Sequence, residues 1–103
     1  MKEKRLTHLI CRVEAFQIIA PYTLLVEFDD RTQQTINFEP ILRGKLYGPL
    51  RDLNLFNRVT LDPEVHTLNW PNGADFDPAT LHDWPQFAAG LAARARQWER
   101  ASA

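Results

Sequence analysis

The strongest constraint on the fold is a series of three short β-type segments, Cys11–Ile19, Leu24–Phe28 and Gln34–Phe38, which only four or five residues separate. In the second and third segments apolar and polar side chains alternate, which is typical of strands with one buried face. In the first segment the apolar phase shifts from Val13 to Phe16, which indicates a β-bulge or a strand buried on both faces. Because connections this short join neighbouring antiparallel strands, the segments predict a three-stranded antiparallel meander.

The middle of the chain predicts short helical turns followed by two further strands. Glycine and proline residues interrupt Pro40–Leu53, so any helix in that stretch is limited to about one turn. Arg58–Leu61 and His66–Trp70 have the composition of strands, and the turn Asp62–Val65 joins them. We expect these two strands to complete a five-stranded, mostly antiparallel sheet.

The last part of the chain predicts a helix, Trp84–Arg100, packed on the sheet. Asp83 precedes it at the position of a helix cap, and Asp77 stands in the same position before a shorter helix that begins at Pro78. Three large apolar residues of the long helix recur at helical spacing, so we expect one apolar stripe formed by Phe87, Leu91 and Trp98.

Length and composition fit a single α+β domain. The chain has 103 residues, of which 45% are hydrophobic and 24% charged, as in ordinary globular domains of one core. We divide it into a basic N-terminal arm (residues 1–10), an α+β core (11–83) and the C-terminal helix (84–100). It has no apolar run typical of a signal peptide or a membrane span, and its single cysteine, Cys11, excludes an internal disulfide. We therefore expect a cytoplasmic protein.

Three segments of the chain resemble the domain-of-unknown-function 2442 family, whose small bacterial domains are related to the N-terminal domain of a candidate DNA-binding protein. The most specific is Leu68–Phe76, which holds a Trp-Pro-Asn-Gly sequence at the end of a predicted strand. The other two are Leu24–Phe28 followed by Asp30, and Gly48–Asp52 followed by Phe56 and Val59. The resemblance covers about residues 11–84 and implies a small α+β fold. Arg31 stands where the family usually has glycine, which implies a different turn there.

What the resemblance implies about function is limited, because no activity is established for the family. Some relatives carry an appended helix-turn-helix domain, and others are encoded beside a second small domain, as in toxin–antitoxin-like pairs. A helix-turn-helix needs at least two helices, whereas one predicted helix follows Asp83, so the chain resembles the stand-alone form.

The residues predict neither catalytic nor metal-binding groups. Cys11 and the three histidines, His8, His66 and His82, lack the spacing of a zinc site, and no glycine-rich phosphate loop is present. We therefore expect no enzyme activity, no cofactor and no metal. The formal net charge of −1 leaves no general field that attracts nucleic acid or a membrane, so direct binding to either is not expected.

Our leading interpretation is a non-catalytic protein-binding module, in its most specific form the regulatory, antitoxin-like half of a two-gene pair. The alternative is a subunit of a DNA-associated transcriptional regulator. A third is a small-ligand or divalent-cation-binding domain that uses Asp75 and Asp77 with His66 or His82.

The predicted interaction surface joins the end of the fifth strand to the last helix. We expect a protein partner there, and a homodimer through Trp98 is a further hypothesis, since aromatic residues are enriched at interfaces. Trp70 is also expected to fill the core. The residues of this surface are Trp70, Asn72, Asp75, Asp77, Arg96, Trp98 and Arg100.

Overall fold

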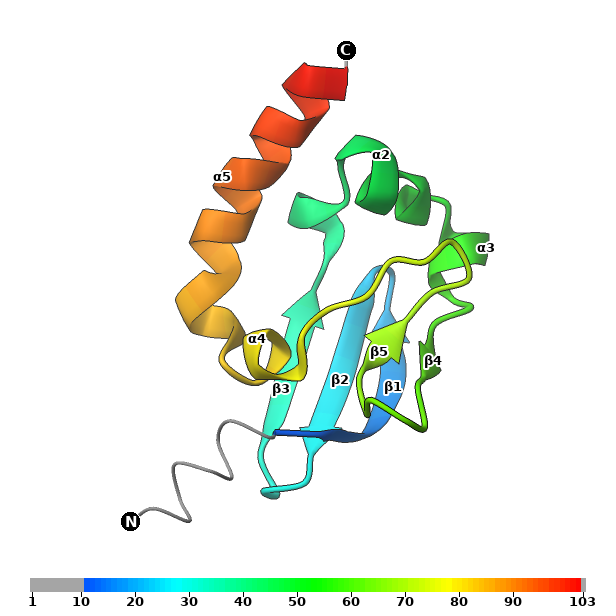
Figure 1. Cartoon of the computed structure of the whole chain (residues 1–103), viewed down its shortest axis with the longest axis vertical. Helices are drawn as coiled ribbons and strands as arrows, with labels where there is room; N and C mark the ends of the chain where they lie inside the picture. The colour runs from blue at the N-terminus through cyan, green and yellow to red at the C-terminus, as the bar shows by residue number, and fades with distance from the viewer. Residues whose placement is uncertain (1–10, 103) are drawn as a thin grey trace.

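The computed structural model describes residues 11–102, and side chains of residues 11–98. The predicted basic arm, residues 1–10, lies outside this range, as does the side chain of Arg100. The described chain folds as an α+β structure in which a three-stranded sheet, a two-stranded sheet and a long C-terminal helix surround one hydrophobic core (Figure 1). The predicted fold class is confirmed.

The predicted meander is present as β1 (Val13–Ala20), β2 (Thr23–Phe28) and β3 (Gln33–Asn37), in the order β1-β2-β3 and antiparallel throughout. The pairing of β1 with β2 shifts between Val13 and Ala15, so the expected bulge is confirmed. The alternative, a strand buried on both faces, is wrong, because Val13 is the only buried residue of β1.

The turn between β2 and β3 has a residue with positive φ, a conformation that glycine favours, although no glycine is present in this turn. Arg31, at the position where the resemblance led us to expect a different turn, has a φ of 73°, in the left-handed region that glycine favours. The Asp30 carboxylate holds the turn, since it accepts hydrogen bonds from the backbone N–H and the hydroxyl of Thr32 at 3.1 and 2.5 Å.

The expected short helical turns follow β3. A glycine is needed at the start of α2, because Gly44 has a φ of 80° and a Cβ there would lie 2.9 Å from the Cβ of Trp98. Each of these turns has three or four residues, and in chain order they are η1 (Glu39–Ile41), α2 (Gly44–Tyr47), η2 (Gly48–Arg51) and α3 (Leu53–Phe56).

The five-stranded sheet that we expected does not form. β4 (Thr60–Leu61) and β5 (Leu68–Asn69) have two residues each and pair with one another in a separate two-stranded sheet, and Asn69 also forms an isolated antiparallel bridge with Asp75. The loop between them turns back tightly, because the Asp62 carboxylate accepts hydrogen bonds from the backbone of Glu64 and Val65. The predicted strands are therefore shorter and make a separate sheet.

The C-terminal helix α5 (Trp84–Ser102) lies along η1 and α2, and the short helix α4 (Pro78–His82) lies beside β3 (Figure 1). Asp77 is the N-cap residue of α4, but its carboxylate makes no capping hydrogen bond within the described residues. Phe87 was wrongly placed on the apolar stripe, since it is 42% exposed. Trp84 docks in the core and sets the helix phase, so the inward side chains are Trp84, Ala88, Leu91, Ala95 and Trp98.

The core centres on Phe38, immediately after β3. Its buried ring contacts four other rings, with centroids 5.3–6.0 Å away. These rings come from α3, from the chain after β5 and from the start of α5, so one side chain joins most layers of the fold. The four are Phe56, Trp70, Phe76 and Trp84.

No helix of the described residues is long and apolar enough to cross a membrane.

Candidate functional site

The chain segment after β5, which we predicted as half of the interaction surface, makes several hydrogen bonds that hold the fold together. Trp70 is only 4% exposed, and its indole Nε1 donates a hydrogen bond to the carbonyl of Phe56 at 2.8 Å. The side-chain amide of Asn72 donates to the carbonyl of Leu46 at 2.9 Å, and its oxygen accepts from the N–H of Ala74 at 3.2 Å. These bonds fix the turn and tie it to α2 and α3.

Asp75 and Asp77 leave their carboxylates exposed. The backbone carbonyl of Asp75 accepts a hydrogen bond from the Tyr47 hydroxyl at 2.9 Å. Burial first, and the charge of Asp75 second, raise the pKa of Tyr47. The described residues hold no group of three or more histidine, cysteine or acidic side chains arranged to bind a metal ion.

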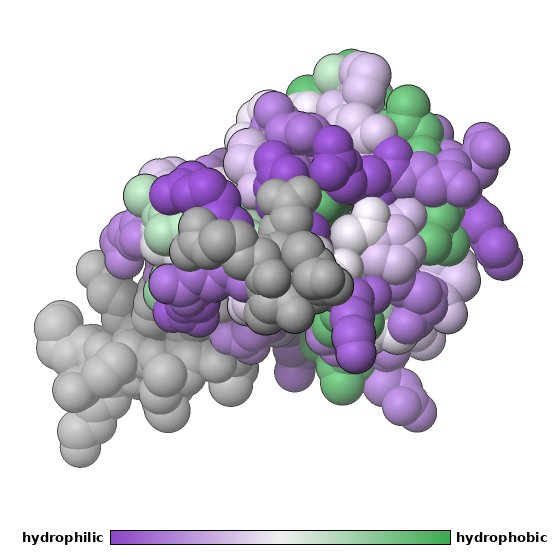
Figure 2. Space-filling model, turned by 90° about the horizontal axis from the view of Figure 1, so that it is seen from above, coloured by the Kyte–Doolittle hydropathy of each residue, from purple (hydrophilic) through white to green (hydrophobic). Residues whose placement is uncertain are grey.

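The two halves of the predicted surface meet inside the protein. Trp98 is half-buried and stacks on Tyr47 with centroids 5.7 Å apart, and Tyr47 stacks in turn on Phe76 at 5.0 Å. The chain itself therefore covers the face of α5 on which a dimer through Trp98 was to form. Arg96 is exposed on α5. Seen from above relative to Figure 1, hydrophilic side chains cover most of the coloured surface, and hydrophobic side chains form small separate patches (Figure 2).

Cys11 lies in an environment that keeps its thiol protonated. The side chain is 8% exposed, and burial, followed by the negative charges of Asp29 and Asp30, raises the pKa of Cys11 to about 12. Since the thiolate is the nucleophilic form, this placement argues against a catalytic role for the cysteine.

We expect Cys11 to resist thiol reagents in the native protein. At pH 8 a disulfide reagent such as dithiobis(nitrobenzoate) should react with Cys11 at least ten times more slowly in the folded chain than in the urea-unfolded chain. Burial restricts access of the reagent, and the raised pKa lowers the fraction of thiolate. The release of the coloured thiolate product gives the rate. Equal rates in the folded and unfolded states would contradict the assigned environment.

His82 links the β2–β3 turn to the junction of α4 and α5. Its Nε2 lies 2.7 Å from Asp30 and its Nδ1 lies 2.8 Å from Asp83. Desolvation alone would lower the pKa of His82, but the hydrogen bonds to Asp83 and Asp30 outweigh it and raise that pKa. The sequence could not reveal this arrangement, because residues 30 and 82 are far apart in the chain.

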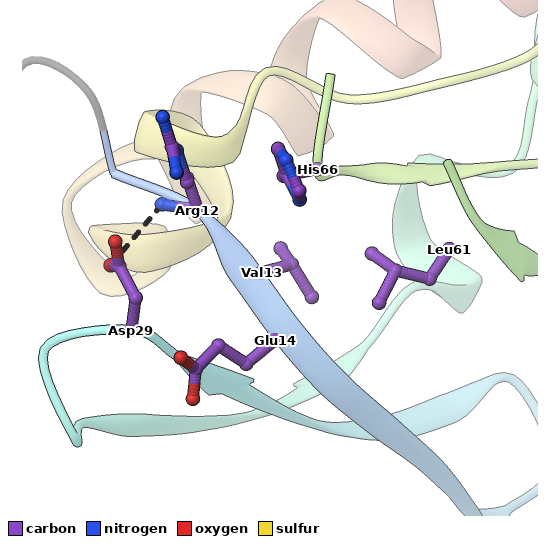
Figure 3. A pocket seen from close by; sticks show the side chains of 6 residues that line it. All are labelled: Arg12, Val13, Glu14, Asp29, Leu61 and His66. Atoms are coloured by element: carbon purple, nitrogen blue, oxygen red, sulfur yellow. Dashed lines mark hydrogen bonds between the residues drawn. The ribbon is translucent and has the colours of Figure 1, made fainter. Parts of the chain in front are cut away.

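An open groove of about 580 Å³ crosses the start of β1 (Figure 3). Arg12 and Asp29 lie at one side of it, with a hydrogen bond of 3.3 Å from the Arg12 backbone N–H to the Asp29 carboxylate, and His66 and Leu61 lie at the other. His66 has a φ of 55°, and its carbonyl accepts a hydrogen bond from the Val13 N–H, which explains the turn without a ligand. The charges around the groove are of both signs, so it does not select an ion of either sign.

The outward side of the three-stranded sheet is the feature that our sequence interpretation missed. The cross-strand register places Gln17, Leu25 and Thr35 in one row across it. We call eight side chains of this side the outer face. Glu27 is the one charged residue among these eight, and the charged residues Glu14 and Arg31 line a hollow together with Glu27 and Gln33 at one end of it. The eight are Ala15, Gln17, Thr23, Leu25, Glu27, Gln33, Thr35 and Asn37.

Beside the outer face runs the free side of β1, which we call the β1 edge, residues 15–20. β1 is an edge strand, and Ile18 and Ile19 are 40% and 47% exposed. The sequence from Ala15 to Ala20 holds no charged residue, no proline and no glycine. That pattern could have been found from the sequence, since the first strand of a meander has only one neighbour within it.

A scan against protein families matches residues 13–86 to DUF2442, described as a protein of unknown function. Neither the search of curated proteins nor that of solved structures found a match. The match covers most of the chain and includes all three segments that carry the sequence resemblance. The chain therefore belongs to the DUF2442 family.

Proposed function

We propose that this protein is a non-catalytic, cytoplasmic protein-binding module that binds its partner with the outer face of the three-stranded sheet. The observation that carries the proposal is the scarcity of charge over most of that face in a chain with 24% charged residues: Glu27 is its one charged member, and Glu14 and Arg31 lie beside Glu27 at one end. Interfaces are depleted of charged residues at their centres, whereas free surfaces normally mix both signs.

The position of the outer face supports the same proposal. The buried side chains of the sheet, such as Leu24, Val26 and Ile36, all point to the other side, where the helices and the two-stranded sheet lie. Six of the eight outer-face side chains are exposed, and Thr23 and Leu25 are half-buried, so a partner could reach all of them. A strand surface held in place by backbone hydrogen bonds loses little conformational entropy on binding.

The most specific form of the proposal is the regulatory half of a two-gene pair. It rests on the relatives in which a second small domain is encoded nearby, and it names the neighbouring gene product as the first partner to test. A DNA-associated regulator remains the competing proposal, but the exposed basic side chains of α5, Arg94 and Arg96, are separated by about 200° around the helix and form no single stripe.

The test is affinity capture from lysate with a matched pair of variants. Thr35→Arg places a charge in the middle of the outer face, and Gln97→Arg places the same charge on the exposed side of α5. We expect Thr35→Arg to lower capture of the partner at least tenfold, because a buried unpaired charge costs more than one factor of ten in affinity. Gln97→Arg should capture as much as the unmodified chain.

Mass spectrometry of nuclease-treated and untreated samples separates the competing functions. Equal capture by both variants would contradict binding through the outer face. A signal that disappears with nuclease would instead favour the DNA-associated regulator.

A further inference from the structure

We propose that the β1 edge pairs antiparallel with the β1 edge of a second copy, so that two three-stranded sheets join into one continuous sheet. This inference goes beyond the proposed function, because the outer face stays free. The dimer would carry two outer faces side by side, and a partner that engages both gains from the high effective concentration of the second site.

The β1 edge has open backbone groups. In an edge strand, alternate N–H and C=O groups point away from the neighbouring strand, here β2. Among the described residues, one backbone hydrogen bond is made on the free side of β1: the Val13 N–H donates to the His66 carbonyl at 2.9 Å. β4 lies close to β1, but within the described part of the chain residues 15–20 make no backbone hydrogen bond outside their pairing with β2.

The other edge of the sheet is protected. α4 lies beside β3, and the side-chain amide of Gln34 donates a hydrogen bond to the carbonyl of His82 at 2.7 Å. Pairing through β1 therefore uses the open edge of both copies at once and gives a closed twofold dimer rather than a fibre.

The sequence of the β1 edge suits a second copy of itself. Monomeric proteins defend edge strands with lysine, proline or inward-pointing charges, and Ala15–Ala20 has none of these. The two register shifts of β1 lie near its ends, so the stretch Ala15–Ile18 stays regular and can pair.

A twofold axis at Gln17 gives a self-complementary register. Ile18 then lies opposite Phe16 of the second copy on the core side of the sheet. The Phe16 ring of the second copy thus covers Ile18, which is 40% exposed in the single chain. The two Gln17 side chains meet on the outer face and can exchange amide hydrogen bonds. Glu14 lies opposite Ala20, so the register opposes no like charges.

Disulfide trapping tests the register. Residues directly opposite in an antiparallel pair have Cα atoms about 4.5–5.5 Å apart, which is within the range of a disulfide. We expect Gln17→Cys to form a covalent dimer under mild oxidation, seen on a non-reducing gel. Thr35→Cys is the matched control, since it lies in the same row of the outer face but on β3, and it should stay monomeric. Equal cross-linking of both variants would overturn the proposed register.

Sedimentation equilibrium tests the dimer itself. We expect the mass of the unmodified chain to rise with concentration from 11.9 kDa toward twice that value. Ile18→Lys should return it to the monomer, because a strand edge with lysine resists pairing. Val65→Lys is the control, since Val65 is an exposed apolar residue outside β1, and this variant should still dimerise.

A monomeric mass for the unmodified chain at millimolar concentration would contradict the proposed dimer. It would not affect the proposal that a partner binds the outer face, which the capture experiment tests separately. Circular dichroism shows whether Ile18→Lys remains folded; if it does not, the Gln17→Cys and Thr35→Cys pair decides the question alone. The failure of either proposal is thus visible without reference to the other.

Discussion

Replacing Phe38 with alanine is expected to destabilise the domain by about 3–5 kcal/mol, which is the usual cost of removing a fully buried phenylalanine ring. The ring has no exposed surface and contacts four other aromatic rings. Domains of this kind are stable by only about 5–15 kcal/mol, so the loss is a large fraction of the total free energy of unfolding. The loss is large because this side chain packs against rings from α3, from the chain after β5 and from the start of α5.

Urea denaturation followed by tryptophan fluorescence measures the effect. Phe87→Ala is the matched control, because the same ring is removed from a side chain that is 42% exposed on α5. That variant should change the free energy of unfolding by no more than about 0.5 kcal/mol. Similar losses in the two variants would contradict the placement of Phe38 at the centre of the core.

The contrast between these two phenylalanines shows what the sequence could predict. Alternation within Leu24–Phe28 and Gln34–Phe38 is a local signal, and it located the strands correctly because each strand has one buried face. The phase of the last helix is not local. Trp84 and Phe87 both lie near the edge of the apolar stripe, and the docking of Trp84 against Phe38 and Phe76 decides which of them is buried.

Tertiary packing also explains the two remaining differences. The strands β4 and β5 are cut to two residues because Trp70 turns into the core and donates a hydrogen bond to Phe56. Trp98 is half-buried against α2 because Gly44 allows α5 to approach, a contact between residues more than fifty positions apart. The outer face could not be recognised from composition, because its side chains are separated in the sequence and become neighbours only through the cross-strand register.

The second large effect expected is a pH-dependent loss of stability in His82→Gln. Both imidazole nitrogens lie within 2.8 Å of a carboxylate oxygen, so both must carry a proton to donate hydrogen bonds to Asp30 and Asp83. The raised pKa of His82 in the folded state means that the charged ring stabilises the fold. Hydrogen bonds to charged groups contribute about 1.5–3 kcal/mol, so we expect a loss of this size at about pH 6.

The sign of the pH dependence follows from both partners. The contribution of His82 is fully present below its unfolded pKa of about 6.5 and is lost as the pH rises through the raised folded pKa. For Asp30, desolvation opposes the shift, but hydrogen bonds from Thr32 and His82 lower the pKa to about 2. The contribution of Asp30 is therefore present above its unfolded pKa of about 4 and is lost as the pH falls toward 2. The ion pair between His82 and Asp30 therefore contributes fully between the unfolded pKa of aspartate, about 4, and the unfolded pKa of histidine, about 6.5.

A double-mutant cycle of His82→Gln and Asp30→Asn isolates the interaction from the other titrating groups. We expect a favourable coupling energy in the free energy of unfolding at about pH 5–6, and a smaller coupling as the pH rises through the raised pKa of His82 and the ring loses its charge. The imidazole ring of His82 joins the turn before β3 to the start of α5. In the unmodified chain, amide hydrogen exchange in α4 should therefore speed up between about pH 6 and pH 9 by more than the intrinsic exchange rate does. A coupling energy that stays constant from pH 5 to 9 would mean that His82 binds these carboxylates as a neutral ring, and its assigned charge would be wrong.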